Sequence, residues 1–328
     1  LASMHAMDPP LEVASRVENY VIRLLTVFVT HDCTLQRVPP RKVLVRFIAV
    51  LNTVHEMLCR GSQCSLRELY YRHVSLFPGG QAESDRILRS VCETFRAPRP
   101  ALGVLSVPKG LVKGDLELLQ LGSSKWKNCG GLLEPRGVSV PATAHRIIQV
   151  RTRARCVLIL EKETLFDRLC EEGFVETWGP VVLVTGRGYP DLPTRYMLSA
   201  LRRLRPDLPF FVAVDFDPHG IAIAATYVMG SETSWHGENF RLDGCTPILE
   251  GDEQALEELG VSRTDRIPLR HRDKARSLLA RFSSGAADPV WLQATKHMLQ
   301  AGFTYELDCI RDLGRFLASN CGLDAKGV

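Results

Sequence analysis

The chain has 328 residues, of which 45% are hydrophobic and 24% are charged, and its formal net charge is +4. This composition is that of a soluble globular protein, and the length predicts about two domains. No run of about 18 apolar residues occurs, so we expect no membrane-spanning segment. The ten cysteines are scattered without a C-x-x-C pair, which favours free thiols in a reducing compartment. The mild positive charge permits a nucleic-acid partner but does not require one.

Residues 1–40 are expected to form an N-terminal helical extension. The sequence begins with Leu1 rather than Met, which indicates a truncated start or a cloning remnant. Apolar residues recur at helical spacing from Leu11 to Val29. This amphipathic helix can pack on the following domain or on a partner protein, and the sequence leaves both alternatives open. A connector follows and closes at Pro39-Pro40.

Residues 41–117 are expected to form an α+β domain. Helices are predicted at residues 41–60, 66–73 and 81–96, the second of them introduced by a capping box at Ser65-Leu66-Arg67-Glu68. A hairpin is predicted from residue 103 to residue 113. Helices followed by a hairpin is the order of a winged helix, a DNA-binding fold, although many small α+β domains share it. Lys109 and Lys113 on the predicted wing are candidate phosphate contacts, with an ordinary solvated face as the alternative.

Residues 118–150 are expected to form a flexible linker, because Gly122-Ser123-Ser124 and Gly130-Gly131 supply small residues. Residues 151–328 are expected to form an α/β domain. Apolar runs at residues 156–160, 181–184 and 210–214 predict buried parallel strands that alternate with helices. Amphipathic helices are predicted at residues 291–299 and 303–317, packed against the sheet.

Three carboxylates follow predicted strands of this α/β domain. Glu161 comes after the first strand, and Asp215 and Asp217 come after the third. In open α/β sheets the carboxyl ends of parallel strands form the ligand-binding edge. Oxygen donors gathered there suit Mg²⁺, which also relieves the repulsion between neighbouring carboxylates. The alternative for each acid is a helix cap.

The Gly-rich loop at Gly186-Arg187-Gly188 lies after the middle strand, and its glycines allow backbone to approach a phosphate closely. Arg187 and Arg195 are candidate DNA contacts, with surface charge as the alternative. Arg272, in a basic segment that leads into a later helix, is a further candidate.

The arrangement of the three acids resembles the Toprim domain of topoisomerases, primases and some nucleases. The longer sequence motif, GRGYPDLPTR followed by VDFDPHG, resembles the A subunit of topoisomerase VI and its meiotic relative, the Spo-eleven double-strand-break transesterase. The resemblance implies an N-terminal winged-helix domain followed by a Toprim, Rossmann-like domain with C-terminal helices. It also implies metal binding by Glu161, Asp215 and Asp217, with Mn²⁺ as a substitute for Mg²⁺.

A tyrosine on a short helix is, taken alone, more often a packing residue than a nucleophile. The wording Arg67-Glu68-Leu69-Tyr70-Tyr71, however, resembles the active-site segment of the Spo-eleven family. The resemblance implies that Tyr71 attacks DNA and that Tyr70 packs. Arg67 matches the family's arginine one turn earlier, and its spacing places it on the same helix face as Tyr71.

The resemblance therefore implies a DNA-cleaving tyrosine transesterase that forms a 5′-phosphotyrosyl link and starts meiotic recombination. It implies double-stranded DNA as substrate, a homodimer at least on DNA, a topoisomerase VI B-like partner, and a location on chromosomes in the nucleus. The alternatives are the A subunit of an ATP-dependent type IIB topoisomerase, a non-catalytic DNA-binding protein of the same fold, and a metal-dependent Toprim nuclease.

Overall fold

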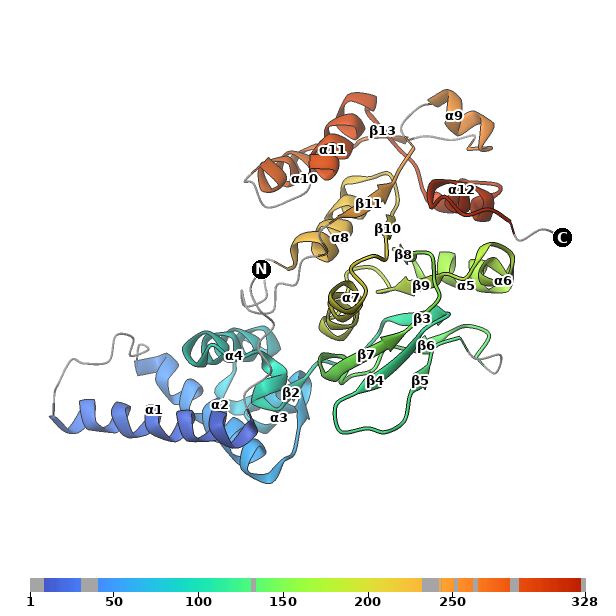
Figure 1. Cartoon of the computed structure of the whole chain (residues 1–328). Coiled ribbons are helices and arrows are strands. Elements are labelled where there is room, and N and C mark those ends of the chain that lie inside the picture. The colour runs from blue at the N-terminus through green and yellow to red at the C-terminus, as the bar shows by residue number, and fades with distance from the viewer. Residues whose placement is uncertain are drawn as a thin grey trace. The chain divides into compact units, whose positions relative to one another are not determined.

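The computed structural model (Figure 1) describes residues 9–30, 41–130, 134–231, 242, 244–250, 253–261, 265–283 and 289–325. The chain divides into two compact units between Val107 and Pro108. Each unit has its own hydrophobic core. The predicted connector at residues 31–40 lies outside the described residues. No helix in the described part of the chain has the length and apolarity that crossing a membrane requires.

The first unit is mainly helical. Its elements are the helices α1 (Pro10–Thr30), α2 (Arg41–Arg60), α3 (Leu66–Arg72) and α4 (Gln81–Phe95), the 3-10 turns η1 (Val74–Leu76) and η2 (Arg99–Leu102), and the strands β1 (Cys64–Ser65) and β2 (Val104–Leu105). The predicted helices are confirmed to within a residue or so at each end. The capping box is confirmed in part, because the Ser65 hydroxyl accepts a hydrogen bond from the backbone N–H of Glu68.

The first unit buries one face of each long helix. Val13 and Val17 of α1 pack with Phe47 and Val54 of α2 in a shared core. The N-terminal helix is therefore a part of this unit. Its opposite face leaves Ile22 exposed, together with Leu11 and Leu25.

The second unit contains the predicted α/β sheet. Its strands are β3 (Leu111–Gly114), β4 (Glu117–Gln120), β5 (Lys127–Asn128), β6 (Val138–Ser139), β7 (Ile147–Arg151), β8 (Val157–Leu160), β9 (Val182–Thr185), β10 (Phe210–Ala213), β11 (Cys245–Ile248), β12 (Asp265–Arg266) and β13 (Phe303–Thr304). Its helices are α5 (Glu163–Glu171), α6 (Phe174–Trp178), α7 (Leu192–Leu204), α8 (Pro218–Met229), α9 (Glu253–Glu258), α10 (Leu269–Arg281), α11 (Pro289–Ala301) and α12 (Leu313–Asn320), with 3-10 turns η3 (Ala144–Arg146) and η6 (Leu307–Cys309).

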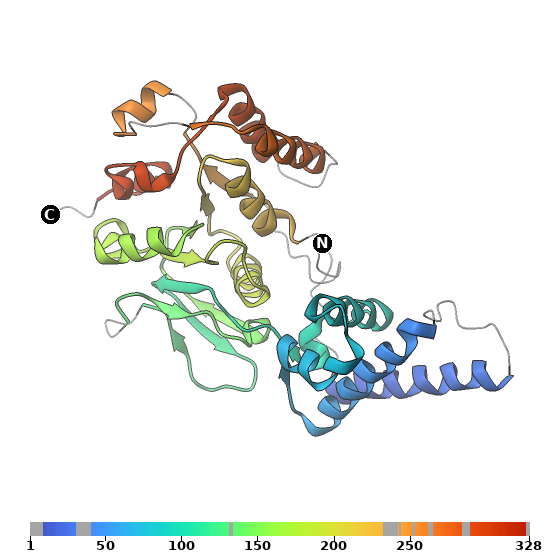
Figure 2. The same ribbon diagram turned by 180° about the vertical axis from the view of Figure 1, so that it is seen from behind.

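The main sheet has the strand order β11-β10-β8-β9-β3-β6. The strands β8 to β11 are parallel, and β3 and β6 extend the sheet antiparallel. Figures 1 and 2 show α5, α6 and α12 on one side of this sheet and α7 and α8 on the other. Every residue of β8 and β9 is buried, as expected for strands that are covered by helices on both faces.

The strand register aligns the carboxyl ends of the central strands. Leu160 at the end of β8 pairs with Ala213 of β10 and with Thr185 of β9. The chain leaves β8 toward α5 on one face, whereas it leaves β10 toward α8 on the other face (Figure 1). Such a reversal opens a crevice at the carboxyl edge of a sheet, where α/β proteins bind ligands.

The predicted hairpin of residues 103–113 is wrong. β2 pairs with β1 of the first unit, whereas β3 pairs with β6 and β9 in the main sheet. Val112 is fully buried, because β3 is an inner strand rather than an exposed wing. Gly110 fits tightly there, since a Cβ would come 2.1 Å from the Thr194 hydroxyl. The division of the chain at residue 107 therefore precedes the expected boundary at residue 117.

The described residues of the segment 118–150 do not form the flexible linker that we expected there. β4, β5 and β7 form an antiparallel sheet, and Leu118 and Ile147 enter the core of the second unit. Gly130 is a site of close packing, because a Cβ would come 2.4 Å from the carbonyl oxygen of Gly114. Gly130 therefore serves close backbone contact rather than flexibility.

The helix predicted at residues 303–317 is wrong in its first half. Residues 303–304 form β13, η6 follows, and only the last part belongs to α12. Phe216 N–H donates to the carbonyl of Tyr305, and Leu307 N–H donates to Oδ1 of Asp215 at 3.0 Å. These bonds hold the segment in an extended conformation at the carboxyl edge of the sheet. Its apolar residues therefore recur at helical spacing without forming a helix.

Candidate active site and metal-binding edge

Tyr71 and Arg67 meet on the exposed face of α3. The Tyr71 side chain is 56% exposed. Arg67 donates to the Tyr71 Oη from Nε at 3.3 Å and from Nη2 at 3.2 Å. The predicted pairing one helical turn apart is confirmed. Guanidinium donors on a phenol oxygen stabilise negative charge on it, which is what a tyrosine nucleophile needs at neutral pH.

The neighbouring side chains of α3 have other partners. Tyr70 is half-buried and packs against the core of the first unit, so its predicted packing role is confirmed. Arg72 pairs with Glu68 at 2.7 Å, which leaves Arg67 as the arginine of α3 that contacts Tyr71. The pair of Arg67 and Tyr71 therefore forms an exposed group on the first unit.

The three predicted metal ligands lie at the carboxyl edge of the main sheet in the second unit. Glu161 follows β8, Asp215 follows β10, and Asp217 begins α8. Glu161 Oε2 accepts from the backbone N–H of Asp215 at 2.9 Å. Asp217 Oδ1 accepts from the backbone N–H groups of His219 at 2.7 Å and of Gly220 at 2.6 Å. Asp217 is thus a helix cap, as the alternative interpretation allowed, and its Oδ2 is not used by the cap.

Burial raises the affinity of this edge for protons or cations. Glu161 is only 9% exposed, and its burial, reinforced by the charge of Asp215, raises its pKa to about 7. Burial also raises the pKa of Asp215 above its ordinary value. A carboxylate with a raised pKa next to another carboxylate is stabilised by any cation that reaches both.

Lys162 supplies such a cation from the chain itself. Its Nζ lies 2.9 Å from Oδ2 of Asp215, 2.9 Å from Glu306 and 2.7 Å from Asp308. Burial opposes the charged form, but the bonds to Asp308, Glu306 and Asp215 outweigh it and raise the pKa of Lys162 above its ordinary value. Lys162, Glu306 and Asp308 were not predicted as site residues. Lys162 follows Glu161 directly, but nothing in the sequence connects it with acids about 145 residues later.

The carboxylates of Glu161, Asp215 and Asp217, the acid triad, share the sheet edge but do not form a compact set of metal ligands in the structure. In the described ranges, the set of three potential ligand groups whose atoms all lie within 4.8 Å of one another is Glu18, His55 and Cys59 in the first unit. Asp215 is held by Lys162 and by the Leu307 N–H, and Asp217 is held by the start of α8. The carboxylate oxygens still fit a hard divalent cation in their chemistry and in their shared sheet edge.

The Gly-rich loop lies against the same edge. Gly188 N–H donates to the carbonyl of Glu161 at 2.8 Å. Gly186 is tightly packed, since a Cβ would come 2.4 Å from the Tyr227 hydroxyl. Exposed Lys109 donates from Nζ to the carbonyl of Arg187 at 3.4 Å, and Arg187 pairs with Glu163 at 2.6 Å. Two predicted DNA contacts, Lys109 and Arg187, therefore lie beside the acidic edge.

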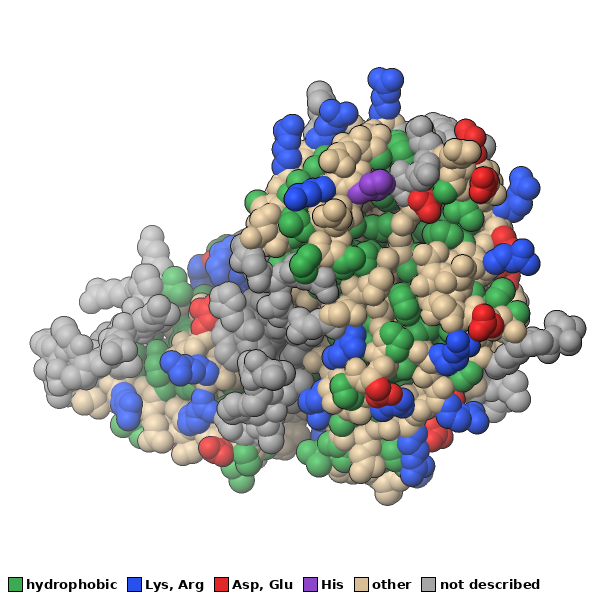
Figure 3. Space-filling model, turned by 45° about the horizontal axis from the view of Figure 1, so that its top comes forward, with side chains coloured by type: hydrophobic (Ala, Val, Ile, Leu, Met, Phe, Trp, Pro, Cys, Tyr) green, Lys and Arg blue, Asp and Glu red, His purple; other side chains and the backbone are tan. Residues whose placement is uncertain are grey.

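Two other predicted DNA contacts, Lys113 and Arg195, are buried in the second unit, which does not favour that role. Lys113 is 7% exposed and donates from Nζ to the carbonyl of Glu134 at 3.3 Å, because its strand is inside the sheet. Arg195 is 5% exposed, because α7 turns that face inward. Arg272 is exposed on α10 and stays a prediction. On the face shown in Figure 3, Lys and Arg side chains are spread over the surface.

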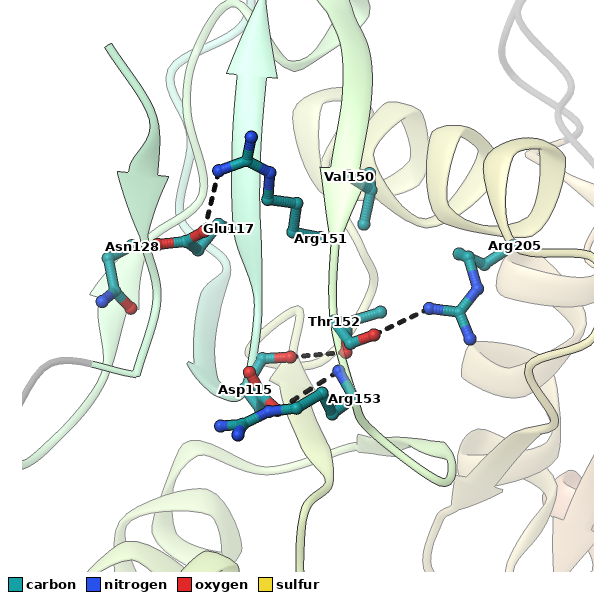
Figure 4. Close-up of a pocket in the computed structure, with 8 residues that line it drawn as sticks. All are labelled: Asp115, Glu117, Asn128, Val150, Arg151, Thr152, Arg153 and Arg205. Atoms are coloured by element: carbon teal, nitrogen blue, oxygen red, sulfur yellow. Dashed lines mark hydrogen bonds and ion pairs between the residues drawn. The ribbon is translucent and has the colours of Figure 1, made fainter.

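A polar hollow of about 580 Å³ lies beside β4, β5 and β7 (Figure 4). Its arginines already have partners within it. Arg153 pairs with Asp115 at 2.9 Å, and Arg205 donates to the carbonyl of Thr152 at 2.8 Å. Arg151 also lies over the ring of Trp126, 4.0 Å from its centroid. These contacts hold the small sheet together, and we assign the hollow no catalytic role.

Comparison with known proteins matches both units. The family model for the Toprim domain of the topoisomerase 6 A-subunit/Spo11 proteins matches residues 156–321, and the model described as "Type IIB DNA topoisomerase" matches residues 42–104. The chain is 34% identical over 275 residues to the meiotic recombination protein SPO11-1 of Oryza sativa subsp. indica, covering 80% of this chain and 68% of the relative.

Relatives in other kingdoms agree. The chain is 29% identical over 268 residues to the human meiotic recombination protein SPO11, covering 80% of this chain and 65% of the relative. It is 30% identical over 266 residues to the meiotic recombination protein rec12 of Schizosaccharomyces pombe, covering 78% of this chain and 70% of the relative. The α/β sheet with its acidic carboxyl edge is accordingly a Toprim domain. The chain belongs to the family of Spo11 and the topoisomerase 6 A-subunit.

Proposed function

We propose that this chain is a topoisomerase-like DNA transesterase that makes the double-strand breaks of meiotic recombination, with Tyr71 as the nucleophile. The observation that carries the proposal is the exposed Tyr71 Oη held by two donors of Arg67. The relatives are meiotic recombination proteins, which favours this function over that of the topoisomerase VI A-subunit. Meiotic recombination acts on chromosomes, so we propose a nuclear location.

The reaction exchanges one phosphodiester for another. Tyr71 Oη attacks the phosphorus, loses its phenolic proton, and forms a 5′-phosphotyrosyl bond, while the bond to the 3′ oxygen breaks and that oxygen leaves with a proton as a 3′-hydroxyl. The number of phosphoester bonds is unchanged, so the cleavage step needs no ATP. Arg67 stabilises charge on the attacking oxygen and on the phosphate, since guanidinium donors bind both.

Toprim domains generally bind divalent metal ions, and the acidic edge described above fits one. We propose that Glu161, Asp215 and Asp217 hold Mg²⁺, with Mn²⁺ as a substitute. Such an ion stabilises negative charge on phosphate oxygens when it is bound. Lys162 has a separate role, in which its ammonium opposes the protonation of Asp215 and orients its carboxylate toward the edge.

The proposal includes two protomers on double-stranded DNA. Tyr71 and the acid triad belong to different compact units. We propose that Tyr71 of one protomer works with the triad of the other and that each protomer cuts one strand.

The exposed apolar side chains of α1, namely Leu11, Ile22 and Leu25, are the proposed contact for a topoisomerase VI B-like partner. We propose that α3 and α4, with the basic side chains Arg67, Arg86 and Arg89, contact DNA as the helices of the expected winged-helix domain would, although the predicted wing itself is an inner strand of the second unit.

The test is a covalent-adduct assay. The purified chain is mixed with end-labelled duplex DNA and Mg²⁺ or Mn²⁺ over a range of protein concentrations and is then denatured. We expect labelled DNA to migrate with the protein, with a steep dependence on concentration. The adduct should be lost in Tyr71→Phe and in Asp215→Asn but retained in Tyr70→Phe, the matched control. Cleavage that survives Tyr71→Phe would overturn the tyrosine mechanism in favour of a metal-dependent nuclease.

A negative result has its own control. If the wild-type chain binds DNA and forms no adduct, the same assay is repeated with the B-like partner of the same organism present. An adduct that appears only then supports the proposal and adds the partner as a requirement. Continued absence of an adduct with that partner and with either metal ion contradicts the catalytic proposal.

A further inference from the structure

Three different metal-binding side chains converge between the first two helices. Glu18 lies on α1, and His55 and Cys59 lie one turn apart on α2. Their potential ligand atoms all lie within 4.8 Å of one another. We infer that these residues form a transition-metal site, suited to Zn²⁺, that clips α1 onto α2. The site is in the first unit and uses none of the residues of the proposed reaction.

The contacts of His55 define where the ion lies. Its Nε2 is 2.7 Å from Oε1 of Glu18 and 3.6 Å from Sγ of Cys59. Zinc bonds of about 2.3 Å to sulfur and about 2.0 Å to nitrogen, at a tetrahedral angle, place those two ligand atoms roughly 3.5 Å apart. The sulfur and nitrogen are therefore already at their ligand spacing. Only the Glu18 oxygen has to move outward, by about half an ångström, and an exposed side chain can do so.

The same geometry argues against a cysteine nucleophile. In a catalytic triad the histidine uses one ring nitrogen for the nucleophile and the other for the acid. Here Glu18 and Cys59 both face Nε2 of His55. One nitrogen directed at two ligand groups is the arrangement of a metal centre, because the ion replaces the direct contacts.

The ligand set selects the type of ion. A thiolate, an imidazole and a carboxylate are mixed soft and hard donors, which suit Zn²⁺ and its relatives, whereas Mg²⁺ prefers oxygen donors alone. Binding releases the thiol proton of Cys59, and the two negative ligands then balance the charge of the ion. Three protein ligands leave a fourth position for water. Glu18 and Cys59 are exposed, so the ion can reach the site from solvent.

The proposed metal site strengthens the contact between α1 and α2 that the apolar core already makes. Val13 and Val17 of α1 pack against α2 on the buried side, and the proposed ion adds a bond across the exposed side. Because the ion binds the folded arrangement and not the separated helices, its binding stabilises the packing of α1.

Cobalt is the probe for this site, because Co²⁺ replaces Zn²⁺ and a bound thiolate gives it an intense charge-transfer absorption. The full chain, stripped with a chelator, is titrated with Co²⁺ and then with Zn²⁺. We expect a sulfur-to-cobalt band that saturates at one equivalent and disappears when Zn²⁺ is added. The band should be lost in Cys59→Ser and retained in Cys309→Ser, since Cys309 is also exposed. His55→Gln and Glu18→Gln should each weaken binding at least about tenfold.

The readout separates this site from the acidic edge of the second unit. Carboxylates there give Co²⁺ no sulfur band, so failure of the proposed transesterase activity leaves this test unaffected. A wild-type chain without the band, or a band unchanged in Cys59→Ser, would overturn the site. If the affinity for Co²⁺ is unchanged in Glu18→Gln, the proposed metal link between α1 and α2 is overturned, because α1 would then contribute no ligand.

Discussion

The ammonium of Lys162 lies 2.9 Å from Oδ2 of Asp215, at the edge where the Toprim domain gathers its acids. Glu306 and Asp308 hold the same ammonium, and the residue between them, Leu307, donates its N–H to the other oxygen of Asp215. The segment after β13 therefore fixes both oxygens of one proposed metal ligand. The acidic edge depends on this segment as well as on the strand ends.

Replacement of Lys162 by methionine should destabilise the chain and change its response to Mg²⁺. Three carboxylates would face one another without their cation, which costs about 1–3 kcal/mol for a partly buried group. Added Mg²⁺ should restore more stability to Lys162→Met than to the wild type, because the ion then supplies the missing charge. Denaturant unfolding with and without Mg²⁺ measures both effects.

The control for this substitution is Lys125→Met, at an exposed position in a turn. It should leave both the stability and the Mg²⁺ response within about 0.5 kcal/mol of the wild type. Equal Mg²⁺ responses in Lys162→Met and the wild type would mean that the ammonium does not share the site of the ion.

Stability should fall as the pH rises toward neutrality when metal is removed by a chelator. The pKa of Glu161 is about 7 in the folded chain, against 4.5 for an ordinary glutamic acid. The folded state therefore binds this proton more tightly than the unfolded state, and its advantage at low pH is lost as the pH rises from about 4.5 to about 7. The shift corresponds to at most about 3 kcal/mol.

Denaturant unfolding at several pH values in this range tests the effect. Glu161→Gln carries no titrating proton and should remove most of the slope, and saturating Mg²⁺ should remove it in the wild type. A wild-type slope that matches that of Glu161→Gln would show that Glu161 titrates normally in the folded chain.

Removal of the Arg67 guanidinium should slow cleavage without preventing DNA binding. Arg67→Ala takes both donors from the Tyr71 Oη, and loss of a donor to developing negative charge costs about 10²–10³ in rate. Single-turnover adduct formation at saturating protein measures the rate. Arg72→Ala is matched to it, because Arg72 lies on the same helix and pairs with Glu68. Equal losses in the two variants would indicate a general effect of charge.

We expect the carboxylate of Asp191 to stabilise the fold of the Toprim unit. Its Oδ1 accepts from Thr194 N–H at 2.7 Å and caps α7, and its Oδ2 accepts from the backbone N–H groups of Lys109 and Gly110. Asp191→Ala leaves these donors without the carboxylate and should cost about 2–3 kcal/mol of unfolding free energy.

The matched control is Asp207→Ala, because Asp207 is exposed and pairs with Arg205 at the surface. It should leave the unfolding free energy close to that of the wild type, because an exposed ion pair contributes little to stability. If Asp191→Ala changes stability no more than this control, the backbone donors find replacements in water.

The sequence by itself determined the elements whose cause is local. The helix Arg41–Arg60 follows from its own apolar spacing, and the start of α3 follows from Ser65, which accepts from the N–H three residues later. The placement of Glu161 and Asp215 at one edge follows from two short apolar runs, rich in β-branched and aromatic residues, that predict buried parallel strands. The pairing of Arg67 with Tyr71 needs only a helical turn between them.

The tertiary structure decided what depends on residues far apart in the chain. The strand at Leu111–Gly114 has the apolar character of a wing and of an inner strand alike, and only pairing with β9 made it the latter. The burial of Lys113 and Arg195 followed from such packing. The ammonium of Lys162 found Glu306 and Asp308 only after the chain had folded, because no local pattern encodes a contact between charges at the two ends of a domain.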